Sequence, residues 1–296
     1  MTFLRRFDMY IPENFNDLLS YLEDHQSGVQ LIANGTDLIN RMQRKQVDAR
    51  VLVDLSGLSE LKYVRRENGT IRIGALTTIQ DLVSSPTLTE RYAAFGDVGS
   101  KFGGPAIVNV ATVGGNICAA SSSEDLIPVL LALNAKVTLR SIRGERVVDL
   151  DHFLKGKRQT ALFPNEILVE TIFDELDGRS ACAFEKIGMR NSLITAFLNC
   201  SVCLKLSKTD KRVEDIRIAM NRISGKIPCR PRKTEAELKG RPLTKEQIEK
   251  SITILGSELQ LSSDFRASRE YRQAVGPVVF KRTLIKCAER LGEKLV

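Results

Sequence analysis

The sequence predicts a two-domain protein of the α/β or α+β class, and three observations carry this prediction. The chain has 296 residues, 43% of them hydrophobic, which is enough to bury a large core. Short segments with helical and strand periodicity alternate through its first part. The composition turns polar around Asp177 and Gly178, and strand-like segments followed by a helical end lie beyond. We therefore expect one domain over residues 1–176 and a second over residues 177–296.

The helices of the first domain are indicated by apolar residues at helical spacing. In residues 14–25, Leu18, Leu19 and Leu22 fall on one side of the helix. The other helices expected in this domain cover residues 79–85 after a Thr77-Thr78 cap, residues 88–102 up to Gly103, and residues 125–133.

Strands are indicated by apolar, β-branched or alternating runs. Those expected cover residues 29–33, 49–55, 70–78 and 135–141 in the first domain, and 182–189, 196–206 and 214–223 in the second. The second domain ends in helices. Thr244 and Gln247 have the spacing of a capping box before a helix over residues 247–255, and residues 278–291 form an amphipathic closing helix.

The formal net charge of +8 does not indicate a nucleic-acid-binding protein. Lysines and arginines are interspersed with acids, and aromatic residues do not alternate with basic ones as in single-strand binders. The charge indicates a solvated surface or one that faces an acidic partner subunit. No apolar run reaches the length of a membrane span, and the first ten residues lack the core of a signal peptide, so we expect a cytoplasmic protein.

Cysteines and histidines offer little for metal or nucleophilic chemistry. In a cytoplasmic protein the six cysteines are expected to be free thiols. Cys200 and Cys203 have the spacing of a redox or metal pair, but they lie in an expected strand, where an odd spacing directs the two sulfurs to opposite faces. His25 and His152 are the only histidines. We therefore expect no metal site and no catalytic residue in this chain.

Two segments of small residues, 33–38 and 112–116, interrupt apolar runs. Glycine at such a place lets backbone N–H groups form a concave anion site, and two of these turns would grip a diphosphate from two sides. The alternative is a pair of tight turns without a ligand. Neither segment matches G-x-G-x-x-G or the Walker lysine motif, so a Rossmann or P-loop assignment fails.

The combination of ANGTDL with ATVGGNICAASSSEDLIPVLLALNAKVTL some seventy residues later resembles the flavin-binding medium subunit of molybdenum-containing hydroxylases, the xanthine dehydrogenase and carbon monoxide dehydrogenase family. NEILVETIF, AFEKIGMR and SDFRASREYR extend the resemblance along the chain. The resemblance implies an α+β fold: an FAD-binding domain of the vanillyl-alcohol-oxidase (PCMH) type with subdomains of about residues 1–56 and 57–176, then a smaller α+β domain.

The resemblance also implies which residues bind FAD. One set would wrap the diphosphate: Leu31, Ile32, Ala33, Asn34, Gly35, Thr36, Asp37 and Leu38. A second grip would come from Thr112, Gly114, Gly115 and Asn116. Phe102, Leu168 and Lys186 would lie near the isoalloxazine ring, and Asp125 would bond to the hydroxyl-bearing chain. Taken singly, each has an ordinary alternative: a core aromatic, a strand leucine, a solvated lysine, or an acid that caps the helix over residues 125–133.

Three positions carry more specific expectations. Asn34 replaces a glycine of many relatives, and asparagine tolerates a left-handed backbone, so the turn should be kept. Asp37 should face away from the diphosphate and accept N–H bonds at the start of the following helix. Leu193 and Ile194 stand where relatives often have Asp-Ile, which leaves the function of that acid open.

The function implied by the resemblance is electron transfer. A molybdenum-cofactor subunit would hydroxylate the substrate, and iron–sulfur clusters on a third subunit would reduce FAD, which would pass electron pairs to NAD(P) or another acceptor. A purine or other N-heterocycle is the expected substrate, because FRASREYR is closer to the xanthine dehydrogenase branch. The alternatives are a stand-alone FAD-dependent oxidoreductase of the same fold superfamily and a basic nucleic-acid-binding module.

Overall fold

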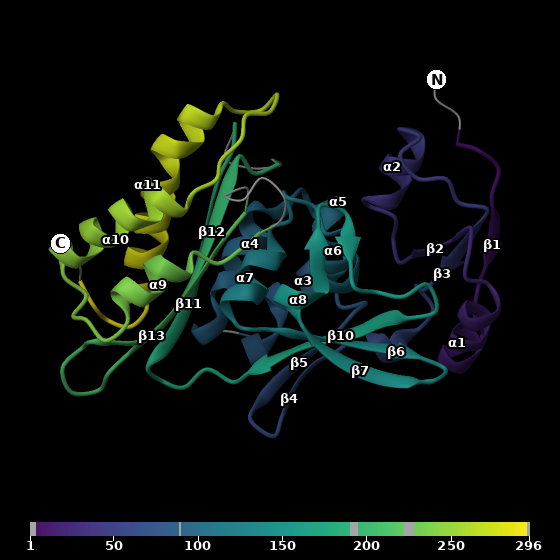
Figure 1. Ribbon diagram of the computed structural model, residues 1–296. Coiled ribbons are helices and arrows are strands. Elements are labelled where there is room, and N and C mark those ends of the chain that lie inside the picture. The colour runs from purple at the N-terminus through teal and green to yellow at the C-terminus, as the bar shows by residue number, and fades with distance from the viewer. Residues whose placement is uncertain (1–3, 89, 190–194, 222–227, 295–296) are drawn as a thin grey trace.

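The computed structural model describes residues 4–88, 90–189, 195–221 and 228–294. In Figure 1 the chain runs from a small sheet near the N-terminus, through a five-stranded sheet in the middle, to a three-stranded sheet under the C-terminal helices. Leu193 and Ile194 lie outside the described residues, as do the last residues of the strand expected over 214–223. No helix of the described part of the chain is both long and apolar enough to cross a membrane.

The first sheet is parallel and has the strand order β1-β3-β2. Its elements are β1 (Asp8–Tyr10), α1 (Phe15–Asp24), β2 (Val29–Ile32), α2 (Leu38–Gln43) and β3 (Val51–Asp54). Asn14 caps α1 by accepting a hydrogen bond from the Asp17 backbone N–H, and Leu18, Leu19 and Leu22 are buried as the periodicity predicted. These leucines pack with Val53 of the first sheet and with Leu76 and Ile167 of the part that holds the five-stranded sheet. The two parts therefore share a core.

The second sheet is antiparallel and has the order β4-β5-β10-β6-β7. Its strands are β4 (Val64–Glu67), β5 (Thr70–Gly74), β6 (Lys136–Ser141), β7 (Gly144–Asp149) and β10 (Ile167–Asp174). The helices of this part are α3 (Ile79–Ser84), α4 (Ala94–Phe102), α5 (Pro105–Val108), α6 (Val113–Ala119), α7 (Leu126–Ala132) and α8 (Leu150–Phe153), and β8 (Leu154–Gly156) pairs with β9 (Gln159–Thr160). Short 3-10 turns cover Ser59–Leu61, Pro86–Leu88 and Glu90–Tyr92.

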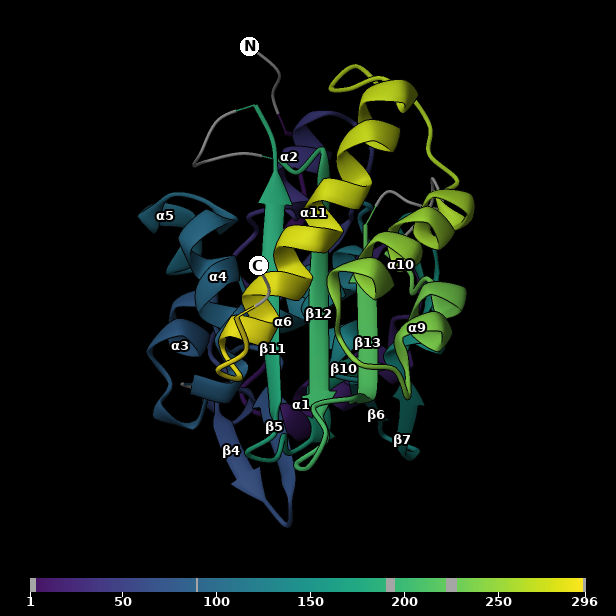
Figure 2. The same cartoon turned by 90° about the vertical axis from the view of Figure 1, so that its left-hand side faces the viewer.

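The third sheet has the order β11-β12-β13 and is buried on both faces. Its strands are β11 (Ser180–Ile187), β12 (Leu198–Leu206) and β13 (Val213–Met220), and the last helices are α9 (Arg232–Leu238), α10 (Lys245–Glu258) and α11 (Arg269–Glu289). Figure 2 shows α11 crossing β11 and β12 on one face, whereas α4 and α7 pack against the other. Cys203 accordingly joins the core shared with α7, and Cys200 joins the core under α11, so the two sulfurs serve opposite faces as expected.

Four details of the expected elements are wrong. The helix over residues 88–102 is divided, because 3-10 turns precede α4. The segment around Gly114 and Gly115 is no turn but the first turn of α6, since the Thr112 side chain accepts a hydrogen bond from the Gly115 N–H and caps it. Only half of the capping box at α10 forms, because the Gln247 side chain bonds to Glu237 instead. The closing helix begins at Arg269, where Ser268 caps it.

Candidate functional site

A cavity of about 790 Å³ lies where the first sheet meets the five-stranded sheet. It is lined by residues of β2 and the β2–α2 turn, of α5 and α6, of the turn before α7, and of the segment that leads into β10. All the residues expected to bind the cofactor line this cavity except Lys186. Segments more than a hundred residues apart in sequence are thus brought to one site.

The first wall is the turn between β2 and α2. Gly35 has the left-handed φ of 71°, and an added Cβ would lie 2.8 Å from Ile39 Cγ1. Within the described part of the chain, the backbone N–H groups of Asn34, Gly35 and Thr36 donate no hydrogen bond. This wall therefore offers a row of free N–H donors and the Thr36 hydroxyl to an anion.

Asn34 supports this turn in a different way from the one expected. Gly35 is the left-handed residue, and Asn34 does not have a positive φ, so its tolerance of that conformation is not needed. The Asn34 amide instead donates to the Val110 carbonyl oxygen at 2.9 Å. It thereby joins the first wall to the loop that leads into α6.

The second wall, at the start of α6, does not offer a backbone nest. The Val113 and Gly114 N–H groups bond to the carbonyl oxygens of Thr77 and Ala75 at 2.9 and 2.8 Å, and Thr112 takes the next two N–H groups. Gly114 is required for packing, since a Cβ there would meet Ala75 Cβ at 2.8 Å and its carbonyl oxygen at 2.9 Å. Donors from this wall must therefore be side chains, namely the Thr112 hydroxyl and the Asn116 amide.

Asp37 does not cap α2, contrary to expectation. It occupies the N-cap position, but its side chain makes no capping hydrogen bond. Its carboxylate instead accepts two hydrogen bonds from Arg158, at 2.7 and 2.9 Å, and lies 3.7 Å from Arg41. The bidentate guanidinium is a stronger partner than a single N–H group, and it neutralises the acid inside an anion site.

Asp125 and Lys186 form a buried ion pair behind the cavity. Lys186 Nζ donates to Asp125 Oδ2 at 2.5 Å and to the Lys101 carbonyl oxygen at 2.9 Å, and Asn199 Nδ2 donates to Asp125 Oδ1 at 2.8 Å. Asp125 makes no capping bond to α7, and Lys186 is buried, so neither ordinary alternative for them holds. Lys186 thus reaches the site only through Asp125.

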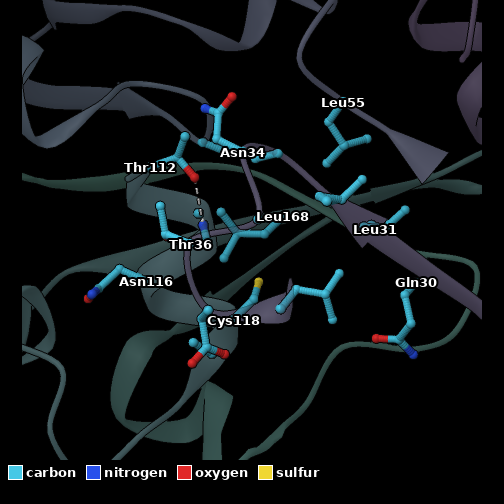
Figure 3. Close-up of a pocket in the computed structure, with 18 of the residues that line it drawn as sticks. Gln30, Leu31, Asn34, Thr36, Leu55, Thr112, Asn116, Cys118 and Leu168 are labelled. Atoms are coloured by element: carbon cyan, nitrogen blue, oxygen red, sulfur yellow. Dashed lines mark hydrogen bonds between the residues drawn. The ribbon is translucent and has the colours of Figure 1, made fainter. Parts of the chain in front are cut away.

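Apolar side chains form another part of the lining. Figure 3 shows Leu31 and Leu55 on one side of the close-up, Thr36, Thr112 and Asn116 on the other, and Leu168 between them. Phe102 lines the same cavity from the end of α4. The site therefore combines an apolar surface for a flat ring with polar side chains for phosphates and hydroxyls.

Sequence reasoning missed the charged lining residues Arg41, Glu124 and Glu166, and also Arg158, which contacts the lining residue Asp37. Glu124 lines the cavity, and its position directly before Asp125 was the only signal in the sequence. Arg158 lies between β8 and β9 and gave no signal, because its contact with Asp37 spans 121 residues. Glu124 accepts a hydrogen bond from Asn116, and Arg158 donates two to Asp37, and both of these partners were predicted site residues.

The residues present fit FAD. A diphosphate requires donors, which the first wall supplies as unpaired N–H groups. The isoalloxazine ring requires a flat apolar surface, which Phe102 and Leu168 supply. Asn116 keeps a buried Oδ1 with no partner in the described structure, as expected for a side chain that awaits a ligand. Among the described residues, no cluster of three or more His, Cys, Asp or Glu side chains is arranged to hold a metal ion.

Comparison with known proteins gives two family matches that cover most of the chain. Residues 5–173 match the FAD binding domain in molybdopterin dehydrogenase, and residues 183–287 match the CO dehydrogenase flavoprotein C-terminal domain.

Individual proteins resemble the chain over nearly its full length. It is 30% identical to the nicotinate dehydrogenase FAD-subunit of Eubacterium barkeri, covering 97% of this chain and 98% of that one. It is 28% identical to the putative xanthine dehydrogenase FAD-binding subunit of Escherichia coli strain K12, over 94% and 95%. Carbon monoxide dehydrogenase of Hydrogenophaga pseudoflava has the same fold, with a TM-score of 0.92 and 26% identity over 97% of this chain and 99% of that one. The α+β fold, with an FAD-binding domain followed by a C-terminal domain, is therefore confirmed.

Proposed function

The chain belongs to the family of FAD-binding domains in molybdopterin dehydrogenases, and from this premise we propose that it carries electrons from the iron–sulfur clusters of a partner subunit, through FAD, to NAD(P) or another acceptor. The observation that carries this proposal is the cavity that joins free backbone N–H groups to an apolar wall. It has the form of a flavin dinucleotide site, and among the described residues of its lining no nucleophile is paired with a base.

The residues of the chain position the cofactor and control its surroundings. FAD, when bound, would accept and donate electrons one at a time or in pairs. The N–H groups of Asn34, Gly35 and Thr36 would hold the diphosphate, as would the side chains of Thr112 and Asn116. Phe102 and Leu168 would orient the ring and keep water from its face. Electron transfer at a flavin requires no acid–base side chain, so positioning and electrostatics suffice.

Two partner subunits complete this function, one with iron–sulfur clusters and one with the molybdenum cofactor. Support comes from the relatives: several are named as FAD or medium subunits of larger enzymes, and the Hydrogenophaga structure is of a carbon monoxide dehydrogenase that lacks the Mo-pyranopterin moiety of its molybdenum cofactor. The net charge of +8 suits an acidic partner surface.

We further propose a purine or another N-heterocycle as the substrate, bound on the molybdenum subunit. Relatives over nearly the full chain are named for nicotinate, xanthine and caffeine, all of which contain ring nitrogens. Relatives named for carbon monoxide and for glyceraldehyde show that the family extends beyond such rings, so a substrate screen must include small gases and aldehydes.

The proposal is tested by purifying the native complex from its source, followed by cofactor analysis and the substrate screen. We expect FAD, iron–sulfur clusters and molybdenum to co-purify in constant ratio, and the reduced complex to transfer electrons to NAD(P) or a dye. Complete substrate turnover by this chain alone would support the stand-alone oxidoreductase instead. A colourless protein that binds nucleic acid with a steep salt dependence would favour the basic binding module.

A further inference from the structure

Asn116 and Glu124 are joined in a way that leaves the amide half satisfied. Asn116 Nδ2 donates a hydrogen bond to Glu124 Oε2, whereas Asn116 Oδ1 is buried and has no partner in the described structure. Both residues line the cavity. One N–H group of this amide thus bonds to a carboxylate of the protein and is not available to a ligand. The site, however, must supply N–H donors to phosphate oxygens.

The protonation state of Glu124 decides whether this amide can turn. An ionised carboxylate only accepts hydrogen bonds, so it holds the Nδ2 end of Asn116. A protonated carboxyl has an O–H donor, which Asn116 Oδ1 can accept after the amide turns by 180° about its terminal bond. That turn places Nδ2 where the unpartnered Oδ1 now lies and releases two N–H donors.

The charges around Glu124 favour its neutral form once an anion enters. Asp125 follows it in the chain, and Asp37 approaches from α2. The nearby cations have other partners: Arg158 and Arg41 lie against Asp37, and Lys186 is bonded to Asp125. Within the described residues no lysine, arginine or histidine forms an ion pair with Glu124, so the two charges of a diphosphate would meet an unneutralised carboxylate.

Burial, reinforced by the charges of Asp125 and Asp37, raises the pKa of Glu124 to about 8 before any ligand is bound, although the charges of Arg158 and Lys186 act to lower it. The side chain is therefore neutral in most molecules at pH 7 and ionised in most at pH 9. A bound diphosphate raises this pKa further, because a third negative charge is added to the cavity.

We propose that Glu124 is a positioning residue that must be protonated for FAD to bind tightly. Where the carboxyl is ionised it binds a proton from solvent when FAD enters, and the protonated carboxyl turns the Asn116 amide so that Nδ2 donates to the diphosphate. The proposal rests on the function assigned to this cavity. It adds a proton to the binding equilibrium, and FAD affinity therefore depends on pH in a range where few other groups titrate.

The test is titration of apo-protein with FAD between pH 6.5 and 9.5. We expect a constant Kd up to about pH 7.5 and then a rise approaching about tenfold per pH unit above pH 8. In Glu124→Gln the amide N–H of the new side chain replaces the carboxyl O–H at every pH, so Kd should stay within about twofold across the range. A shared slope in both proteins, or none in the wild type, would overturn the proposal.

Glu166→Gln provides a matched control, because Glu166 also lines the cavity but has its own cation. Although burial acts to raise its pKa, Arg146 and the Phe163 N–H lower it, so Glu166 is already ionised throughout the range. This variant should keep the wild-type slope above pH 8. If the pH dependence of Kd disappeared in Glu166→Gln, the slope would not come from Glu124.

Calorimetry on the unaltered protein covers the case in which Glu124→Gln fails to fold. Titrations at pH 8.5 in buffers of different ionisation enthalpy should show uptake of about 0.8 proton per FAD. Uptake near zero overturns the inference while leaving FAD binding intact. Absence of FAD binding at every pH, in folded protein, would instead overturn the function proposed for the cavity.

Discussion

Arg158 donates two hydrogen bonds to the carboxylate of Asp37, from Nη1 to Oδ2 at 2.7 Å and from Nη2 to Oδ1 at 2.9 Å. Arg158 Nη1 also donates to the Ala119 carbonyl oxygen at the end of α6, at 3.0 Å. One guanidinium therefore fixes the start of α2 to the end of α6, which carry the two walls of the cavity. Arg158 does this from a left-handed backbone with φ of 62°, a strained conformation that surrounding contacts must hold in place.

Arg158→Met should weaken FAD binding by about tenfold or more, since loss of a charge-assisted bidentate pair costs about 1.5–3 kcal/mol. Asp37→Asn should have a smaller effect in the same direction, and the double variant should be no weaker than Arg158→Met, because the pair acts as a unit. Fluorescence titration of apo-protein measures each Kd. Arg179→Met removes a similar pair with Glu214, far from the cavity, and should leave Kd unchanged. If the losses of FAD-binding free energy in the two single variants simply add in the double variant, Arg158 and Asp37 do not act as a unit.

Gly35→Ala should lower FAD affinity more than it lowers stability. Alanine would be strained at the φ of 71° that this position has, and its Cβ would lie 2.8 Å from Ile39 Cγ1. The turn must therefore move, and its free N–H groups lose their alignment. We expect a loss of at least about tenfold in affinity, from a strain of about 1–2 kcal/mol. Gly57→Ala is the control, because its added Cβ meets no atom within 4 Å and its φ lies outside the left-handed region. Equal losses in both variants would exclude this explanation.

Lys186→Met should lower the free energy of unfolding by about 3–5 kcal/mol, since it leaves the carboxylate of Asp125 buried without its cation. Adding Asp125→Asn should recover part of that loss, because the uncompensated charge is then removed. Urea denaturation of the apo-proteins gives both values. If the double variant is less stable than Lys186→Met, the buried charge is not the cause.

The apo-protein should lose stability as pH rises from about 4.5 to about 8. The pKa of Glu124 is raised from 4.5 to about 8 by burial and by Asp125 and Asp37. A raised pKa stabilises the folded state fully below the unfolded value, and this contribution is lost as pH rises through the folded value. The difference in unfolding free energy between Glu124→Gln and wild type should therefore increase over this window. A difference independent of pH would show that Glu124 ionises normally.

Cys200 and Cys203 should resist alkylation in the native protein and bind no zinc. Burial raises the pKa of the Cys200 thiol to about 12 and also raises that of Cys203, so little thiolate exists at pH 8. Mass spectrometry after iodoacetamide treatment should find both residues unmodified until urea is added. Rapid modification of both in folded protein would reopen the redox interpretation of this pair.

The sequence alone determined the order and type of most elements and a part of the cavity lining. Periodicity placed α1 with its buried leucines, and period-two alternation separated Cys200 from Cys203, because local geometry sets both patterns. The small residues at Gly35 and Gly114 are visible without a structure, since no other residue type suits a left-handed turn or a helix packed against Ala75. Resemblance then assigned FAD to these segments. The family match confirms an FAD-binding domain over residues 5–173, and the binding by these particular segments stays a prediction.

Only the tertiary structure decided what the charged side chains contact. Asp37 had the pattern of a helix cap, but Arg158, distant in sequence, outcompetes the N–H groups of α2. Lys186, taken singly, could have been a solvated lysine, yet in the structure it is buried in β11 and paired with Asp125. Glu124 gained its raised pKa mainly from burial, and also from the charges of Asp125, which follows it, and of Asp37 from a distant segment. Hydrogen bonds and ion pairs depend on distances of a few ångströms between segments far apart in the chain, and local sequence patterns do not encode those distances.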